Sequence, residues 1–441
     1  MLYYRAAKEH TSNSLLVQCI LRDRQPMRCV RSSRLNMAAR HVTFPSPGPL
    51  KPASGSFAVR GVLTRRASPV VPVLRPRLPS AAGILPFLQR IDEVQWYSNY
   101  GPLVKRLESD LAGLIDCTME RVVTTANATC GITVALLARG VRAGSACIMP
   151  SWTFAATPHA ARAAGLTPWF HDVDASSWAL DPDRVEETVK NQPDTSIGAV
   201  IVVSPFGAPL DMDAWEAFED RTGICVVVDA AAGFDTVRPS RIPSVVSLHA
   251  TKIFGAGEGG FITTTDAQLL DRIAACCNFG FEGSRSAILP ALNAKMSEYH
   301  AAVALAALQL WPGTRAANLR IIEWYRRALS RISGIALQPG YGDGWACGTT
   351  SIVLPAGMLP NVARSLSERG IETRAWWGDG CHVQPAFADC RCGPLDVTEQ
   401  LAGRVLGLPH YTDMPKRDVD FVAEAISTAL GRSLRAQRRA S

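Results

Sequence analysis

The chain has 441 residues, of which 47% are hydrophobic and 19% are charged, and its formal net charge is +7. This composition excludes disorder over the whole length and fits roughly two to three domains with a sizeable core. The longest apolar run, residues 299–311, includes His300 and Gln309 and is shorter than the ~18 residues of a membrane-spanning helix. We therefore expect no membrane-spanning segment.

The positive charge is concentrated at the start of the chain. Residues 1–66 contain twelve basic and two acidic side chains, so the remaining residues carry a net charge of −3. The overall charge is therefore no evidence that the folded part binds nucleic acid, and we predict no such partner. Four prolines between residues 45 and 52 oppose a helix there. We expect a disordered tail or the product of an upstream start codon, with Met27 or Met37 as the true start, in preference to an Arg-rich targeting peptide.

From about residue 90 the pattern alternates between helices and strands. Leucines between residues 103 and 114 recur at helical spacing, and residues 153–165 predict a helix that ends at Gly165. Short apolar runs predict strands over 146–150, 167–174, 198–207, 223–233, 244–250 and 259–266. This alternation predicts an α/β domain with a mostly parallel sheet in residues 67–310, an architecture that binds ligands at the carboxyl ends of its strands.

After residue 280 the elements become shorter. Helices are predicted over 297–311, where Pro312 should end the first, and over 315–329. Short segments at 351–355 and 370–374, a helix at 361–369 and a closing helix at 418–430 follow. We assign residues 311–430 to a smaller α+β domain and residues 431–441 to a frayed basic tail.

The chain has twelve cysteines and no secretory signal, which predicts reduced thiols in a cytoplasmic protein. Cys381, His382, Cys390 and Cys392 form the one cluster that resembles a zinc site. The Cys-x-Cys spacing is poor for tetrahedral ligands, and no second Cys-x-x-Cys pair supports it. We predict no metal site.

Two residues at the ends of predicted strands suggest chemistry. Asp229 ends a buried strand, and Lys252 follows the next strand, before a glycine-rich turn. Apolar neighbours would desolvate the lysine amine, which lowers its pKa and makes it a nucleophile toward carbonyls. A lysine on a loop is more often a solvated charge, and an aspartate at a strand end is often a cap. Together, however, they match pyridoxal phosphate, which takes a lysine at its aldehyde and an acid at its pyridine nitrogen.

A third segment is a candidate site for the phosphate of that cofactor. A strand over 122–125 turns into a helix at Ala128 and Thr129, and amides at a helix N-terminus bind phosphate well. An ordinary Asn/Thr helix cap is the alternative, and it would be favoured if the segment stood alone. With Lys252 and Asp229 in the same chain, we favour the phosphate site.

These segments occur in the same order as in one enzyme family. Over residues 68–430 the chain resembles the DegT/DnrJ/EryC1/StrS sugar aminotransferases, a branch of the fold-type I pyridoxal phosphate enzymes. The resemblance is carried, in order, by YSNYGPLVKRLE, NATCGITVAL, PSWTFAAT, HDVD, SPFG, VVVDAAAGFD, SLHATKIFGAGEGGFITT, NAKMSEYHAAVALAALQL and LGLPHYTDMP. It implies a three-layer α/β fold with a mostly parallel central sheet, a smaller C-terminal α+β domain, and homodimers with shared active sites.

The resemblance also implies roles for individual residues. Lys252 would bond to the cofactor aldehyde and transfer protons, Asp229 would pair with the pyridine nitrogen, and Phe154 would stack on the ring. The phosphate would be bound by Ala128, Thr129 and Ser247, and by Asn293 of the neighbouring subunit. The sugar would be contacted by Trp152, His249 and His382. For each of the last three residues, a packed structural role is the alternative.

One position departs from the family pattern. The family commonly has His or Gln three residues after the aspartate, where this chain has Ala232. The exchange removes one hydrogen bond near the cofactor ring. Some relatives that dehydrate a sugar have histidine at the position of this lysine, whereas this chain retains Lys252.

The resemblance implies transamination of a keto-sugar linked to a nucleotide, with L-glutamate as the amino donor. Two alternatives remain: a transaminase for a non-sugar carbonyl compound, and a non-catalytic regulator that binds pyridoxal phosphate. Residues 374–377 are expected to help select the substrate.

Overall fold

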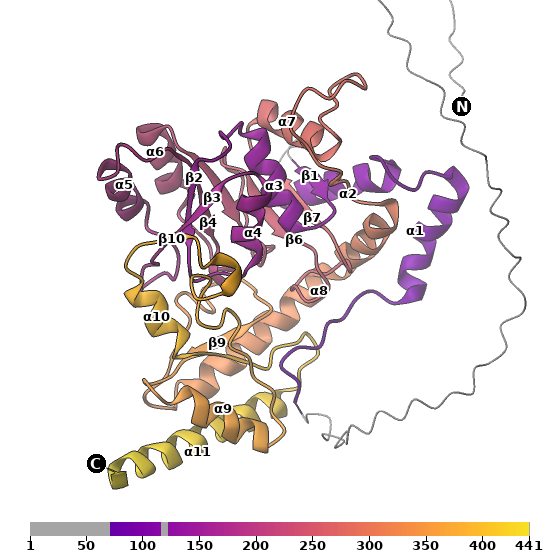
Figure 1. Cartoon of the computed structure of the whole chain (residues 1–441). Coiled ribbons are helices and arrows are strands. Elements are labelled where there is room, and N and C mark those ends of the chain that lie inside the picture. Colours follow the sequence, from indigo (N-terminus) through magenta and orange to yellow (C-terminus); the bar gives the residue numbers. More distant parts are fainter. Residues whose placement is uncertain (1–70, 116–121, 441) are drawn as a thin grey trace, which may run out of the picture. The chain divides into compact units, whose positions relative to one another are not determined.

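The computed structural model describes residues 71–115 and 122–440 (Figure 1). These residues belong to one compact unit of the chain, residues 65–441. The extension predicted over residues 1–66 lies outside the described part. No helix among the described residues is long and apolar enough to cross a membrane.

The larger of two sheets has eight strands in the order β1-β7-β6-β5-β4-β2-β3-β10. The strands are β1 (Val122–Thr125), β2 (Ala146–Pro150), β3 (Thr167–His171), β4 (Ile197–Val203), β5 (Cys225–Asp229), β6 (Ser244–Ser247), β7 (Gly260–Thr263) and β10 (Arg391–Cys392). Strand β7 is antiparallel to its neighbours β1 and β6, and the other neighbouring pairs are parallel. The predicted mostly parallel sheet is confirmed.

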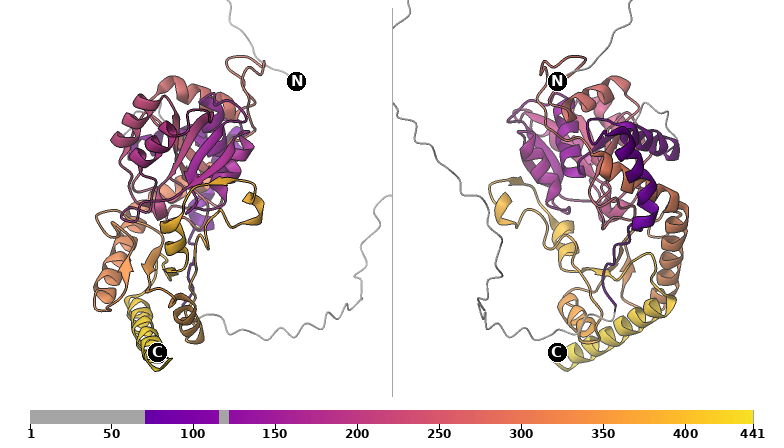
Figure 2. Two further views of the ribbon diagram at one scale, coloured as in Figure 1. Left: turned by 60° about the vertical axis from the view of Figure 1, so that its left-hand side comes forward. Right: turned by 90° about the vertical axis from the view of Figure 1, so that its right-hand side faces the viewer.

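Helices cover both faces of this sheet (Figures 1 and 2). Because alternate side chains of a strand point to opposite faces, Val200 and Val202 of β4 enter one apolar core and Ala199 and Ile201 enter the other. The first core includes residues of α1 (Ala81–Val94), α2 (Pro102–Leu114), α5 (Pro182–Lys190) and α6 (Met212–Thr222), and the second includes residues of α3 (Ala128–Ala138), α4 (Ala156–Ala163) and α7 (Ala267–Cys277). This is the predicted three-layer arrangement.

Helix α8 (Glu298–Leu329) runs from the large sheet to the smaller one (Figure 1). The sequence predicted two helices separated at Pro312, and this prediction is wrong, because Pro312 lies inside one continuous helix. A proline in a helix interior costs about 3 kcal/mol. The helix packs on both sides of it, with Leu305 in the core of the large sheet and Tyr325 in the core of the small one. Burial along the helix offsets the cost of the proline.

The smaller sheet is antiparallel, in the order β11-β9-β8. The elements of this part are β8 (Ala336–Leu337), β9 (Thr350–Val353), α9 (Leu359–Glu368), α10 (Asp396–Ala402), β11 (Val405–Leu408) and α11 (Lys416–Ala440). The expected smaller α+β part is therefore present. Helix α11 continues to Ala440, beyond the predicted end at Leu430, so the expected frayed tail from residue 431 is helical instead.

Candidate active site

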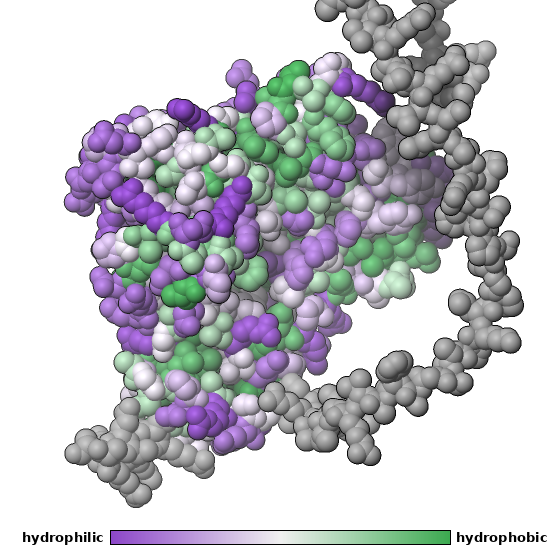
Figure 3. Space-filling view, viewed as in Figure 1, coloured by the Kyte–Doolittle hydropathy of each residue, from purple (hydrophilic) through white to green (hydrophobic). Residues whose placement is uncertain are grey.

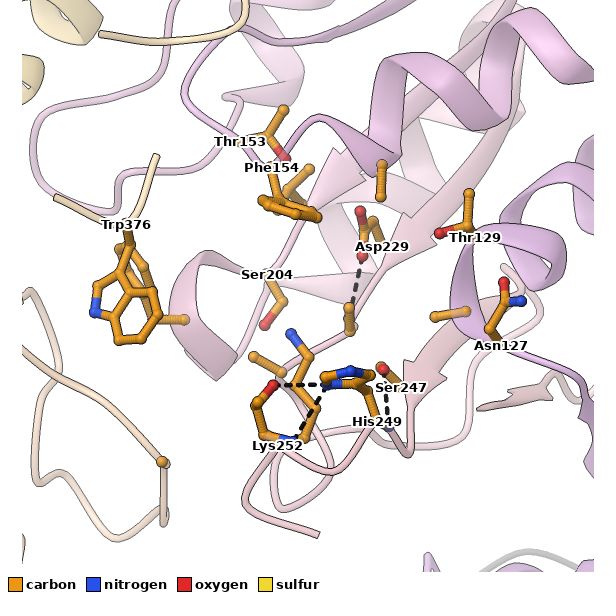
Figure 4. A pocket seen from close by; sticks show the side chains of 18 of the residues that line it. Asn127, Thr129, Thr153, Phe154, Ser204, Asp229, Ser247, His249, Lys252 and Trp376 are labelled. Carbon is orange, nitrogen blue, oxygen red and sulfur yellow. Dashed lines mark hydrogen bonds between the residues drawn. The ribbon is translucent and has the colours of Figure 1, made fainter. Parts of the chain in front are cut away.

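A pocket of about 870 Å³ lies at the carboxyl ends of the parallel strands (Figure 4). Its walls come from the segments that follow β2, β4, β5 and β6, from the start of α3, and from residues 374–377 between α9 and α10. This is the edge at which open parallel sheets bind ligands. The predicted site residues that line the pocket are Ala128, Thr129, Phe154, Asp229, Ser247, His249 and Lys252.

Asp229 is the last residue of β5, and its side chain is buried. Its carboxylate accepts hydrogen bonds from the Thr157 hydroxyl at 2.7 Å and from the Ala231 amide at 3.1 Å. Burial raises the pKa of Asp229, while these hydrogen bonds and the positive charge of Lys252 lower it. Since the Thr157 hydroxyl donates to Asp229, it accepts the hydrogen bond of 2.8 Å that joins it to Thr153. The two threonines thus orient the carboxylate and favour its ionised form.

Lys252 lies in the turn that follows β6, and its side chain points into the pocket (Figure 4). The Lys252 amide donates a hydrogen bond of 2.9 Å to the His249 carbonyl and so closes the turn. Burial lowers the pKa of Lys252, and the carboxylate of Asp229 opposes that shift. A lowered pKa increases the fraction of neutral amine, which is the nucleophilic form. The structure thus brings the predicted lysine and aspartate into one pocket.

The start of α3 forms one end of the pocket. Asn127 is the N-cap and accepts a hydrogen bond of 2.8 Å from the Cys130 amide, so the helix-cap interpretation is also correct. The first amides of a helix, here those of Ala128 and Thr129, have no carbonyl partner within the helix. The start of α3 packs closely against Gly260 of β7, and only glycine fits there, because a Cβ at that position would lie 2.9 Å from the Ala128 nitrogen. The pocket therefore meets the positive end of a helix, which suits an anion.

Phe154 lines the pocket with 64% of its surface exposed, a high value for a large aromatic residue. It belongs to the segment between β2 and α4. Figure 4 shows its ring near Asp229 and above Lys252 in that view. A planar ligand stacked on this ring would cover its apolar face.

The other predicted residues differ in their positions. His249 lines the pocket, with its Nδ1 atom 2.8 Å from the Thr251 hydroxyl. Trp152 and His382 are not part of the lining: Trp152 is buried and packs edge-on against a neighbouring tryptophan, and His382 is hydrogen-bonded to Ser151 at 2.8 Å. These contacts match the packed alternative, and the sugar-binding role of the two residues stays a prediction. Asn293 is exposed outside the pocket, and its predicted contact requires a second subunit.

The cysteine cluster near residue 390 is accounted for by other contacts. The Cys381 thiol donates to the Thr153 carbonyl at 3.3 Å, and the Cys390 sulfur accepts from Arg162 at 3.2 Å. Within the described ranges, no group of three or more His, Cys, Asp or Glu side chains could hold a metal ion.

Sequence reasoning missed two residues that shape the site. Thr157 orients the buried aspartate, but a threonine inside a helix gives no distinct sequence signal. Phe206 lies in the short helix η1 (Pro205–Gly207) after β4, with a φ of 52°, and its ring stacks on Trp377 at 4.1 Å. A positive φ is uncommon for a bulky residue, and the Pro-Phe-Gly turn at a strand end was the available signal. Residues 374–377, expected to help select the substrate, do line the pocket apart from Ala375.

The chain belongs to the DegT/DnrJ/EryC1/StrS aminotransferase family, whose model matches residues 82–427. A dTDP-4-amino-4,6-dideoxy-D-glucose transaminase of Escherichia coli is 30% identical over 359 residues, which cover 78% of this chain and 94% of that protein. A solved structure of a putative PLP-dependent aminotransferase from Bacillus cereus is 30% identical, with a TM-score of 0.76, and the match covers 81% of this chain and 99% of that one. The structure of DesI in the presence of its TDP-sugar product is 34% identical, with a TM-score of 0.75 and coverage of 85% and 96%.

The protein is therefore an aminotransferase, and its cofactor is pyridoxal phosphate. The pocket fits this cofactor: the start of α3 suits the phosphate, Phe154 the face of the ring, Asp229 the pyridine nitrogen, and Lys252 the aldehyde. Ala232 also lines the pocket and presents only a methyl group where the family commonly has a polar side chain.

Proposed function

We propose that this aminotransferase moves an amino group from L-glutamate to a keto-sugar linked to a nucleotide, and that the resulting amino sugar enters a polysaccharide, a glycan or an antibiotic. The observation that carries the proposal is the meeting of Lys252 and Asp229 in one pocket beside the exposed ring of Phe154. The sugar is supported by two relatives, the dTDP-4-amino-4,6-dideoxy-D-glucose transaminase and DesI with its TDP-sugar product.

Lys252 and Asp229 would have different roles in proton transfer. When bound, pyridoxal phosphate supplies an electron sink for the carbon from which a proton leaves. Lys252 is the sole amine side chain among the described residues that line the pocket. It is therefore positioned to take the proton from the donor Cα atom and to return it during amination of the acceptor. Asp229, oriented by Thr157, would keep a hydrogen-bonded proton on the pyridine nitrogen.

A visible absorption spectrum of the purified holoenzyme, recorded before and after addition of L-glutamate, tests the proposal. We expect the yellow band of the bound cofactor to fall and a band in the near ultraviolet to rise. Lys252→Ala should abolish this response, whereas Lys190→Ala, on an exposed helix, should not. A cofactor band that ignores every amino acid tested would contradict the proposal and favour the non-catalytic alternative. Turnover of simple ketones but of no nucleotide-linked keto-sugar would favour the non-sugar alternative.

We further propose that two copies of the chain form a dimer with shared active sites. Tyr97 and Tyr299 are exposed and stack on each other at 6.3 Å, and Phe279 and Ile288, in the segment after α7, are exposed as well. Figure 3 shows apolar residues gathered over α7 and this segment. Exposed apolar surface of this kind suits an interface, and Asn293 lies close by in the sequence. The proposed dimer uses this face and places Asn293 at the partner's pocket, as the family resemblance implies.

Mixed dimers test the shared site. If the site combines Lys252 of one subunit with Asn293 of the other, co-expression of Lys252→Ala and Asn293→Ala chains should restore about a quarter of wild-type activity, because half of the random dimers are mixed and each has one intact site. The separate variants serve as controls. Lack of rescue, or a monomer in light scattering, would contradict the shared site.

We also infer a cytoplasmic location from the cysteines. All nine cysteines in the described part of the chain are free, as expected in a reducing compartment. Visualisation of a tagged chain outside the cytoplasm would contradict this inference.

A further inference from the structure

The pocket has a second wall, opposite the start of α3 (Figure 4). Arg374 and Trp376 form it, and they come from the segment between α9 and α10. Figure 4 shows Trp376 on the opposite side of the pocket from Thr129 and the start of α3. With the cofactor phosphate at the α3 end, this wall faces the space left for the substrate.

The guanidinium of Arg374 lies over the ring of Trp376, 5.3 Å from its centroid. The two acidic residues of the pocket lining are engaged elsewhere: Asp229 accepts from Thr157, and Glu258 lies 3.5 Å from His249. No carboxylate among the described residues forms an ion pair with Arg374. The pocket thus contains a guanidinium that lies over an aromatic ring and has no anionic partner among the described residues.

Strand β11 holds this wall in place. Arg374 and Gly407 of β11 exchange two backbone hydrogen bonds, of 3.0 and 2.8 Å. The indole of Trp376 lies against Gly407, where a Cβ would be 2.2 Å from the indole nitrogen and 2.8 Å from the Arg374 carbonyl oxygen. The indole can occupy this position only because residue 407 has no side chain.

We propose that Arg374 and Trp376 form the subsite for the sugar acceptor, in which the indole packs on the sugar ring and the guanidinium binds an oxygen of the attached diphosphate. This inference rests on the proposed function. Aromatic side chains offer a flat surface to the apolar face of a ring, and the planar guanidinium matches phosphate oxygens. L-Glutamate has carboxylates but no ring, so the combination of indole and guanidinium selects the nucleotide sugar. Gly407 is a positioning residue for both.

Calorimetric titration of the holoenzyme with dTDP-glucose, UDP-glucose and GDP-glucose tests the subsite, because these probes have the ring and the diphosphate but no keto group. For the tightest probe, Arg374→Gln should weaken binding about tenfold or more, and Arg374→Lys should weaken it less. Trp376→Ala should also weaken binding, and Trp376→Phe should retain most of it. Unchanged affinity in Arg374→Gln and Trp376→Ala would overturn the proposal.

The glutamate response separates the two substrates. For Arg374→Gln, we expect the affinity for the nucleotide sugar to fall by a larger factor than the rate at which L-glutamate bleaches the cofactor band. A loss for glutamate as large as that for the nucleotide sugar would assign Arg374 to the donor carboxylate and overturn the proposal. Failure of the proposed function would give a different result from failure of the subsite. In that case the cofactor band of the wild type would not respond to L-glutamate, and the calorimetric titration with nucleotide sugars would still test the subsite.

A pair of glycine variants tests the positioning role. Gly407→Ala should weaken binding of the same nucleotide sugar several-fold through displacement of Trp376, and by a larger factor than it slows the glutamate response. Gly393→Ala is the matched control, because a Cβ there meets nothing within 4 Å. Far-ultraviolet circular dichroism verifies that both variants fold. Equal affinities in the two variants would overturn the role of Gly407.

Discussion

Replacement of Thr157 by valine tests how the buried carboxylate is controlled. Valine keeps the shape of the side chain but removes the hydroxyl donor that lies 2.7 Å from Asp229. Among the described residues, the Ala231 amide, at 3.1 Å, is then the remaining hydrogen-bond donor to this carboxylate. A hydrogen bond to a charged group contributes about 1.5–3 kcal/mol. A loss near 2 kcal/mol corresponds to about a 30-fold change in an equilibrium constant. The Thr157 contact exists without the cofactor, so only part of this loss reaches the binding equilibrium, and we expect Thr157→Val to bind pyridoxal phosphate more weakly by at most about 30-fold.

The direction of the pH dependence follows from the same contacts. Burial raises the pKa of Asp229 and the Thr157 hydrogen bond lowers it, so the variant should have the higher pKa. Its carboxylate then becomes neutral sooner as the pH falls, and the affinity loss should be larger at pH 6 than at pH 8. Titration of the apoenzyme with cofactor, followed by visible absorption, measures both. Thr157→Ser keeps the hydroxyl and should bind nearly as wild type. A serine variant as weak as the valine variant would refute the reasoning, because packing would then be the cause.

Three further predictions concern separate parts of the chain. Burial lowers the pKa of His410 to about 3. Because the unfolded residue takes up a proton below pH ~6.5 and the folded residue does not, the free energy of unfolding decreases as the pH is lowered from 7.5 to 5. Urea unfolding at these two pH values should show about 2 kcal/mol less pH dependence in His410→Gln than in wild type. Gly313→Ala in α8, where a Cβ meets nothing within 4 Å, should stabilise the chain by about 0.5–1 kcal/mol in unfolding experiments, whereas Gly131→Ala should destabilise it, since its Cβ would lie 2.6 Å from Val245. Phe154→Ala should weaken cofactor binding about tenfold in the apoenzyme titration, with little change in the unfolding midpoint of the apoenzyme, because the ring is exposed there.

The sequence predicted the strands that carry the site because central parallel strands are buried on both faces. Such strands appear as continuous apolar runs, as in β4 and β5. Asp229 is the last residue of β5 and Lys252 lies in the turn after the next strand, so their meeting at one edge of the sheet follows from local pattern and the topology of parallel sheets.

Features that depend on contacts between distant residues could not be predicted in the same way. Thr157 and Asp229 are 72 positions apart, and no local pattern indicates their hydrogen bond. The local rule for Pro312 gave the wrong result, because the rule ignores the two cores that hold α8 on either side of it. Strand β10 has two residues, too few to form a pattern, and is recognised only by its pairing with β3.

The two walls of the pocket depend on different sheets, and this separation has a chemical consequence. Lys252 and Asp229 are placed by β5 and β6 of the large sheet, which also supports the start of α3. Arg374 and Trp376 are placed by β11 of the small sheet, through Gly407. With the proposed roles, substitutions behind the second wall should change which acceptor binds without moving Lys252 and Asp229. We therefore expect proton transfer and acceptor choice to be separable by substitution.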